Sequence, residues 1–199
     1  MRPLIATGDP RKSVDISRKA ELYETSSGMI TITGGKLTTY RRMAKMAVDR
    51  LVERDDRRAP CRTDRIPLGR SIAVRELRRV DGVPETAYEP LVARYGAAAQ
   101  RVLAVAAERP QLAQPVVDGL PDLLAEVAFA ARHEQAGSIA DVLLRRTRLA
   151  LLAAREVGRA DVLESVADTL AGELGWDAVR RSREVERLRA EAVAEGVAP

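Results

Sequence analysis

The sequence contains one cysteine, Cys61, and one histidine, His133, in 199 residues. A single cysteine excludes an internal disulfide framework, and one residue of each kind leaves no Cys/His cluster for a metal ion. A Ser-His-Asp or Cys-His catalytic site is also disfavoured, because its histidine must be held by further partners. We therefore expect no metal site and no nucleophilic catalysis of these classes.

Aromatic residues are scarce as well, at 3% of the chain, while hydrophobic residues make up 46%. Leu, Val, Ala and Ile must therefore form nearly all of the core, which favours contacts between helices. No apolar run approaches the roughly 20 residues of a membrane-spanning helix, and the N-terminus lacks the apolar segment of a signal peptide. We expect a protein that is cytoplasmic or bound peripherally to the cytoplasmic face of a membrane.

The formal net charge of +4 is unevenly distributed along the chain. Residues 1–80 contain 19 Lys and Arg against 10 Asp and Glu, a net of +9, whereas residues 81–199 contain 14 against 19, a net of −5. Excess positive charge can attract nucleic acid, anionic lipid or a phosphorylated metabolite. Because aromatic residues for base stacking are not interleaved with the basic ones, we expect no nucleic-acid partner.

The N-terminal part reads as short extended segments separated by turn signals. These segments predict an antiparallel sheet fragment that needs further strands to bury its faces, so we expect the chain to begin in the middle of a domain. A helix is predicted over 38–54. The segments are "RPLIAT" (2–7), "SVDIS" (13–17), "AELYE" (20–24) and "MITIT" (29–33).

A charge-rich connection with prolines at 60 and 67 follows this helix, and from residue 84 the periodicity is helical to the end. The sequence therefore predicts an α+β protein with three parts. Residues 1–56 form a β-rich fragment, 57–83 a linker, and 84–199 an all-α domain. Its helical segments are 84–96, 97–109, 121–134, 138–158, 159–176 and a last one from Asp177, with Pro121 opening a helix and Gly96, Gly158 and Gly175 ending others.

The turn between the last extended segment and the first helix has an unusual composition: Gly34 and Gly35 precede Lys36, and Thr38 or Thr39 can cap the helix. Such a corner presents backbone N–H groups at the positive end of a helix, beside an ammonium group, which suits an anionic ligand. A purely structural turn explains the glycines equally well. The fingerprints G-x-x-x-x-G-K-[ST] and G-x-G-x-x-G are both absent.

In this order, the segments of the chain resemble the C-terminal part of the FAD-dependent, quinone-linked glycerol-3-phosphate dehydrogenases, which belong to the glycine-oxidase-like flavoproteins. The resemblance covers almost the whole chain and corresponds to roughly the last third to two-fifths of such an enzyme. The segments that carry it are "RPLIA" (2–6), "DISRKAELYE" (15–24), "ITITGGKLTTYRRMA" (30–44), "LVARYG" (91–96), "AEVAFAARHEQAGSIADVLLRRTRLAL" (125–151) and "GELGW" (172–176).

The resemblance implies that the glycine corner contacts the isoalloxazine ring of FAD, at the pyrimidine edge where negative charge builds up on reduction. The implied cofactor-binding residues are Gly34, Gly35, Lys36, Leu37 and Thr38.

The resemblance also implies that Arg2, Arg18 and Lys36 bind the substrate, with Arg18 and Lys36 acting in catalysis. The implied reaction oxidises glycerol 3-phosphate to dihydroxyacetone phosphate by hydride transfer to FAD, with electrons passing to quinone. The resemblance further implies that the enzyme contacts a membrane peripherally and forms a homodimer.

The Rossmann-like segment with the glycine-rich loop that binds the FAD pyrophosphate has no counterpart in this sequence. We therefore expect the chain alone to be inactive. The alternatives are a helical interaction module without enzymatic activity and a part of a related FAD-dependent glycerol-3-phosphate oxidase that uses oxygen.

Two clusters of polar residues in the predicted helical domain could suggest a functional site, but we assign neither of them a function. His133 and Glu134 belong to the helical domain and are expected to be structural. Arg145, Arg146 and Arg148 are interpreted as partners of acidic residues such as Glu134 and Asp141 rather than as a lipid-binding patch.

Overall fold

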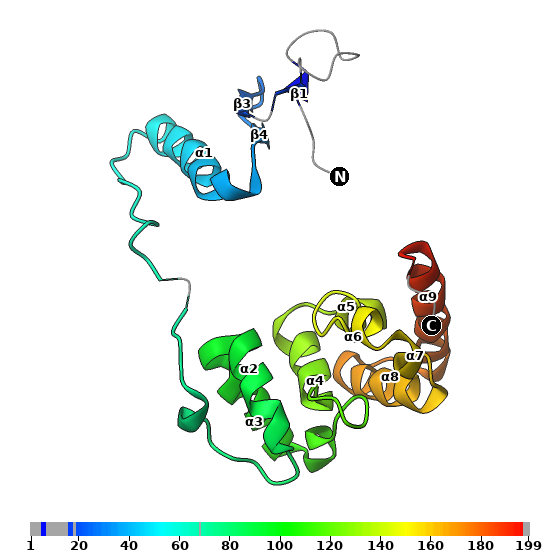
Figure 1. Cartoon of the computed structure of the whole chain (residues 1–199). Helices are drawn as coiled ribbons and strands as arrows, with labels where there is room; N and C mark the ends of the chain where they lie inside the picture. Colours follow the sequence, from blue (N-terminus) through cyan, green and yellow to red (C-terminus); the bar gives the residue numbers. More distant parts are fainter. Residues whose placement is uncertain (1–4, 7–15, 18, 68, 197–199) are drawn as a thin grey trace. The chain divides into compact units, whose positions relative to one another are not determined.

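The computed structural model describes residues 5–6, 16–17, 19–67 and 69–196, and the chain divides into two compact units, Met1–Leu68 and Gly69–Pro199 (Figure 1). The division falls inside the segment predicted as a linker. Arg2 and Arg18 lie outside the described residues. None of the described helices is long and apolar enough to span a membrane.

The extended segments predict one antiparallel sheet fragment, whereas the described part of the N-terminal unit contains two small antiparallel sheets. Strand β1 (Ile5–Ala6) pairs with β2 (Ile16–Ser17), and β3 (Ala20–Glu24) pairs with β4 (Ile30–Gly34). In the second pair Ala20 faces Gly34 and Glu24 faces Ile30. The Thr25 hydroxyl closes this hairpin by accepting a hydrogen bond from the Met29 N–H at 3.1 Å.

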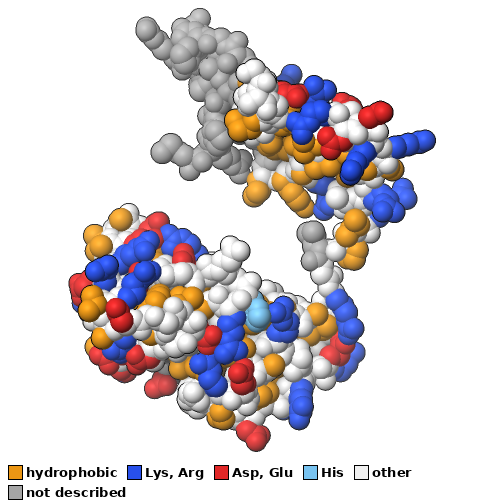
Figure 2. Space-filling model, turned by 180° about the vertical axis from the view of Figure 1, so that it is seen from behind, with side chains coloured by type: hydrophobic (Ala, Val, Ile, Leu, Met, Phe, Trp, Pro, Cys, Tyr) orange, Lys and Arg blue, Asp and Glu red, His pale blue; other side chains and the backbone are white. Residues whose placement is uncertain are grey.

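The helix predicted over 38–54 begins with a 3-10 turn, η2 (Leu37–Thr39), and continues as α1 (Tyr40–Arg54). No described residue in β3, β4 or α1 is buried. Met29 is 60% exposed and Tyr40 54%. Figure 2 shows hydrophobic side chains gathered on one face of this unit. The described part of the unit, mainly residues 19–67, therefore contains almost no core of its own.

The described part of the C-terminal unit, residues 69–196, consists mainly of helices, and their order follows the predicted segments. The helices are α2 (Tyr88–Tyr95), α3 (Ala99–Glu108), α4 (Leu124–His133), α5 (Ile139–Leu143), α6 (Leu149–Leu152), α7 (Ala154–Val157), α8 (Ala160–Leu174) and α9 (Ala178–Ala194). The short 3-10 turns η3 (Val74–Glu76) and η4 (Glu85–Ala87) precede α2, η5 (Gly96–Ala98) lies between α2 and α3, and η6 (Pro110–Ala113) follows α3.

Two hydrophobic clusters fill this unit, and α4 contributes to both. Its Phe129 packs with residues of α2 and α3, whereas its Val127 packs with residues of α5, α8 and α9. Leu77 and neighbouring apolar residues from the segment before η4 also pack against the first cluster. The predicted α+β class, with a β-containing start and an all-α C-terminal part, is therefore confirmed.

The helical segment predicted over 138–158 is broken into α5, α6 and α7, and the reason lies in its backbone. The Val142 carbonyl accepts hydrogen bonds from the Arg146 N–H, the Thr147 N–H and the Thr147 hydroxyl at 3.0–3.1 Å. Arg148 then adopts a left-handed conformation, with φ of +61°. Periodicity in the apolar residues does not reveal such a break, because α5 and α6 both supply buried residues.

Helix ends follow the sequence signals in most places. Gly96, Gly158 and Gly175 each lie at a helix C-terminus, as predicted. Pro121, expected to open a helix, lies three residues before α4. The helix begins later because the Glu126 carboxylate accepts a hydrogen bond from the Leu123 N–H at 2.9 Å.

A buried ionic network lies at the start of α4. The Arg94 guanidinium pairs with Asp122 at 2.6 Å and with Glu126, whose side chain is 1% exposed. Burial raises the pKa of the Glu126 carboxyl, and the Arg94 charge opposes that rise. Burial is the main cause of a raised pKa at Tyr95, and the charge of Glu126 raises this pKa further. The Tyr95 and Phe129 rings pack edge to face, with their centroids 5.5 Å apart. The network joins α2 to α4.

Replacing Arg94 with Met should destabilise the helical unit by about 3–5 kcal/mol, because it leaves a buried carboxylate without its partner. The measurement is urea unfolding followed by fluorescence of Trp176, the only tryptophan of the chain. Arg145→Met is the matched control, since Arg145 pairs with Glu191 on the surface, and it should cost about 1 kcal/mol or less. Equal losses in the two variants would contradict this account.

Candidate functional site

The glycine corner, defined as residues 34–38, joins the end of β4 to η2. Gly34 and Gly35 both have left-handed backbones, with φ of +75° and +77°. The Gly35 N–H donates a hydrogen bond to the Lys19 carbonyl at 3.2 Å, which holds the corner against the start of β3. Left-handed angles at two successive residues favour glycine at both positions.

A second constraint acts on Gly35. A Cβ atom at this position would overlap Sδ of Met43 on α1. The Met43 side chain on α1 therefore occupies the space that a Cβ atom at position 35 would need. This contact was not foreseen from the sequence, in which Met43 reads only as a residue of an apolar helical face.

Thr39 holds the start of η2, but as the residue before α1 it forms no side-chain capping hydrogen bond to that helix, contrary to the prediction. Its hydroxyl accepts a hydrogen bond from the Lys36 N–H at 3.0 Å and donates one to the Lys36 carbonyl at 2.9 Å. The Thr39 N–H also donates to this carbonyl, at 2.9 Å. Thr38 is exposed. The backbone on both sides of the Lys36 amide is thereby held in place.

The corner presents donors and positive charge to solvent. The N–H groups of Leu37 and Thr38 are the first two of the turn, where a helical segment offers no internal acceptor. The Lys36 side chain is exposed and forms no ion pair with another described residue. The partial positive charge of the helix start adds to the ammonium group. This arrangement can hold an anionic or electron-rich edge of a ligand.

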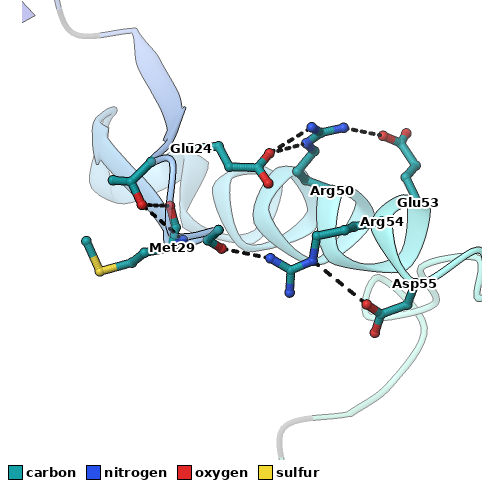
Figure 3. Close-up of polar contacts among 8 residues, drawn as sticks. Glu24, Met29, Arg50, Glu53, Arg54 and Asp55 are labelled. Carbon is teal, nitrogen blue, oxygen red and sulfur yellow. Dashed lines mark hydrogen bonds and ion pairs between the residues drawn. The ribbon is translucent and has the colours of Figure 1, made fainter.

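The opposite end of α1 is tied to the hairpin loop (Figure 3). Arg50 donates two hydrogen bonds to Glu24 Oε2, at 2.9 and 2.7 Å, and Arg54 donates one to the Gly28 carbonyl at 2.7 Å. The helix is thus attached to the hairpin at both ends. Sequence reasoning missed this tie, although the spacing of Arg50 and Arg54 by one helical turn is a signal for it.

The other candidate residues divide into those that the structure describes and those that it does not. The structure brings together the predicted residues 34–38, while Arg2 and Arg18 fall outside the part of the chain that it describes. His133 is exposed in the helical unit, with Nδ1 3.1 Å from Arg101 and its ring 4.7 Å from that of Phe129. Among the described residues, no three His, Cys, Asp or Glu side chains come together to hold a metal ion.

Two of the three neighbouring arginines pair with acidic residues, as interpreted from the sequence. Arg145 pairs with Asp141 at 3.6 Å and with Glu191, and Arg146 pairs with Glu134 at 3.3 Å. Arg148 forms no ion pair within residues 69–196.

Residues 61–181 match the family described as the C-terminal domain of alpha-glycerophosphate oxidase. The chain belongs to this family. The match covers most of the helical unit and the end of the N-terminal unit, and it leaves the glycine corner outside.

Curated relatives of this alpha-glycerophosphate oxidase family member extend the similarity. Glycerol-3-phosphate dehydrogenase 1 of Mycobacterium tuberculosis is 41% identical over 157 residues, 76% of this chain and 30% of the relative. The mitochondrial glycerol-3-phosphate dehydrogenase SDP6 of Arabidopsis thaliana is 34% identical over 210 residues, 95% of this chain and 33% of the relative. The glycerol-3-phosphate dehydrogenase of Synechocystis sp. is 30% identical over 200 residues, 94% of this chain and 35% of the relative.

The chain therefore spans about a third of the length of the curated relatives it matches. Its resemblance to the C-terminal portion of glycerol-3-phosphate dehydrogenases, predicted from the segments above, is confirmed.

Substituting Gly35 with Ala should loosen the glycine corner, because the change imposes a left-handed backbone on a residue with a side chain and displaces Met43. The backbone cost alone is about 1–2 kcal/mol. Hydrogen exchange followed by mass spectrometry should show faster exchange in residues 30–44.

Gly69→Ala is the matched control, since a Cβ atom there meets nothing within 4 Å. Unchanged exchange at 30–44 in the Gly35 variant would show that the corner tolerates a side chain.

Proposed function

We propose that this chain supplies the flavin edge, the substrate edge and the helical domain of an FAD-dependent glycerol-3-phosphate dehydrogenase. The whole enzyme would oxidise sn-glycerol 3-phosphate to dihydroxyacetone phosphate. The observation that carries the proposal is the glycine corner, with its two left-handed glycines and an exposed ammonium that pairs with no acidic residue among those described, in a chain whose relatives are named glycerol-3-phosphate dehydrogenases.

The geometry of the corner fits a flavin edge. Gly34 and Gly35 carry no side chains to keep a planar ring away, and the Leu37 and Thr38 N–H groups can donate to its oxygen and nitrogen atoms. FAD, when bound, would supply the acceptor for the hydride that leaves C2 of glycerol 3-phosphate. Lys36 would place positive charge where negative charge develops, which lowers the barrier to the transfer.

Arg2 and Arg18 complete the proposal on the substrate side. A guanidinium group can bind a phosphate or a substrate oxygen through two parallel hydrogen bonds, so these two residues are proposed to bind the phosphate and position C2. Arg18 and Lys36 are the residues proposed to act in catalysis.

The proposal also covers the electron acceptor, the cellular location and the oligomeric state of the enzyme. Electrons would pass to quinone, the enzyme would lie in the cytoplasm or on the cytoplasmic face of a membrane, and it would form a homodimer. The family description, which names an oxidase, supports a second candidate in which oxygen replaces quinone.

Whether the chain retains FAD distinguishes the proposed part of a flavoenzyme from the alternative, a helical interaction module without enzymatic activity. The chain is mixed with FAD, passed through gel filtration and examined by its visible spectrum. Flavin that stays with the protein supports the proposed corner, and its loss supports the module. We expect no oxidation of glycerol 3-phosphate with a dye acceptor by the chain alone, and measurable turnover would contradict this expectation.

Replacing Lys36 with Met should slow reduction of bound FAD on the order of a hundredfold or more, because one preorganised charge near the developing negative charge is lost. The variant is made in a fusion of this chain to the part of the Mycobacterium tuberculosis relative that precedes the match. Stopped-flow reduction at saturating glycerol 3-phosphate measures the rate, and a redox titration measures the flavin potential.

Lys45→Met is the matched control, because Lys45 lies on α1 in the same unit and pairs with Asp49 on the surface. It should leave both quantities unchanged. A Lys36 variant with the parent's rate and potential would show that Lys36 is only a turn residue.

A further inference from the structure

A cavity of about 290 Å³ lies in the helical unit among α6, α7, α8 and α9. Its interior is apolar. Val157, Leu163 and Leu188, all less than 5% exposed, form the deeper part, and alanines of α6, α7 and α9 form the sides. All of its lining residues belong to the C-terminal unit.

Three arginines surround this apolar interior: Arg155, Arg159 and Arg189. The charges of two of these arginines are balanced by neighbouring acidic residues. Arg159 binds Asp161 through two hydrogen bonds at 3.1 and 2.6 Å, and Arg189 pairs with Glu186 at 2.7 Å. Arg155 is exposed and forms no ion pair with any residue that the structure describes. The cavity therefore combines an apolar interior with one uncompensated positive charge.

The size of the cavity limits what can occupy it. An α-helix with its side chains is about 10–12 Å across, so even one turn exceeds the space available. The volume lies at the lower end of the range for small-molecule sites, about 300–1,000 Å³. A flexible alkyl chain matches both the volume and the apolar lining.

We propose that this cavity binds a single-chain anionic amphiphile, with the alkyl chain among the side chains of α7, α8 and α9 and the anionic head group on Arg155. A carboxylate and an alkyl phosphate present the same chemistry to a guanidinium group. The site does not depend on the flavin function proposed above.

Isothermal titration calorimetry of the full chain tests the proposal, with dodecanoate and dodecyl phosphate as probes below their micellar concentrations. Octanoate and decanoate give the dependence on chain length, and dodecanol gives the contribution of the head-group charge. Affinity should rise roughly fourfold for each added methylene group until the cavity is full. Dodecanol should bind more weakly than either anion. The ratio of the two anion affinities identifies the preferred head group.

Two variants locate the binding. Arg155→Gln should lower the affinity for dodecanoate about tenfold and leave that for dodecanol unchanged. Ala154→Phe places a ring in the cavity and should abolish binding of both. Arg75→Gln is the control, because Arg75 is another exposed arginine of the same unit, outside the cavity.

Circular dichroism melting confirms that each variant is folded. Ala154→Leu, a smaller change at the same lining position, serves should Ala154→Phe fail to fold. It should weaken dodecanoate binding at least twofold. Dodecanoate binding of equal strength in the parent, Arg155→Gln and Ala154→Leu would overturn the proposal, since it would place the amphiphile elsewhere on the chain.

Discussion

The helical unit depends on the burial of α4 between two hydrophobic clusters. Because one face of this helix packs on α2 and α3 and the other on α5, α8 and α9, neither cluster can close without it. Its first turn contains the buried carboxylate of Glu126, which can be tolerated only while Arg94 lies beside it. The position of α2 is therefore fixed by charge as well as by packing. A second ionic contact, from Arg132 to Glu173 at 2.6 Å, joins α4 to α8.

The N-terminal unit is organised on a different principle. It lacks buried side chains in β3, β4 and α1, and its geometry rests on hydrogen bonds and on the packing of the Met43 side chain against Gly35. The glycine corner holds one end of α1 and the Arg50 and Arg54 contacts hold the other. Such a unit can present backbone donors accurately while leaving apolar side chains available for further packing.

Local signals in the sequence predicted much of this fold. Alternating β-branched residues located β4, the apolar period located α1 and α8, and glycines located several helix ends. The failures arose where tertiary contacts decide. The break after α5 depends on three donors meeting one carbonyl, and the late start of α4 depends on a capping carboxylate.

Features of the candidate site can likewise be divided into those that local sequence signals predict and those that depend on tertiary contacts. The pair of glycines and Lys36 could be recognised from composition, because left-handed backbones and a helix start leave a clear signature. The contact of Gly35 with Met43 could not, since it joins a turn to a helix and no periodicity extends across that boundary. The hydrogen bonds between Thr39 and Lys36 were not predicted either, because the sequence offered Thr38 and Thr39 only as caps of the following helix. Arg2 and Arg18 rest on resemblance alone.

The uneven distribution of buried side chains has a calorimetric consequence. The heat capacity increment of unfolding and the denaturant dependence of stability both scale with the surface exposed when a protein unfolds. Since the buried apolar residues lie between Leu77 and Ala192, both quantities should correspond to a domain of the size of the helical unit rather than to the full 199 residues. A heat capacity increment matching the full length would instead require the strands and α1 to bury their apolar faces in solution. A ligand or partner that covers these apolar faces would increase the heat capacity increment of unfolding.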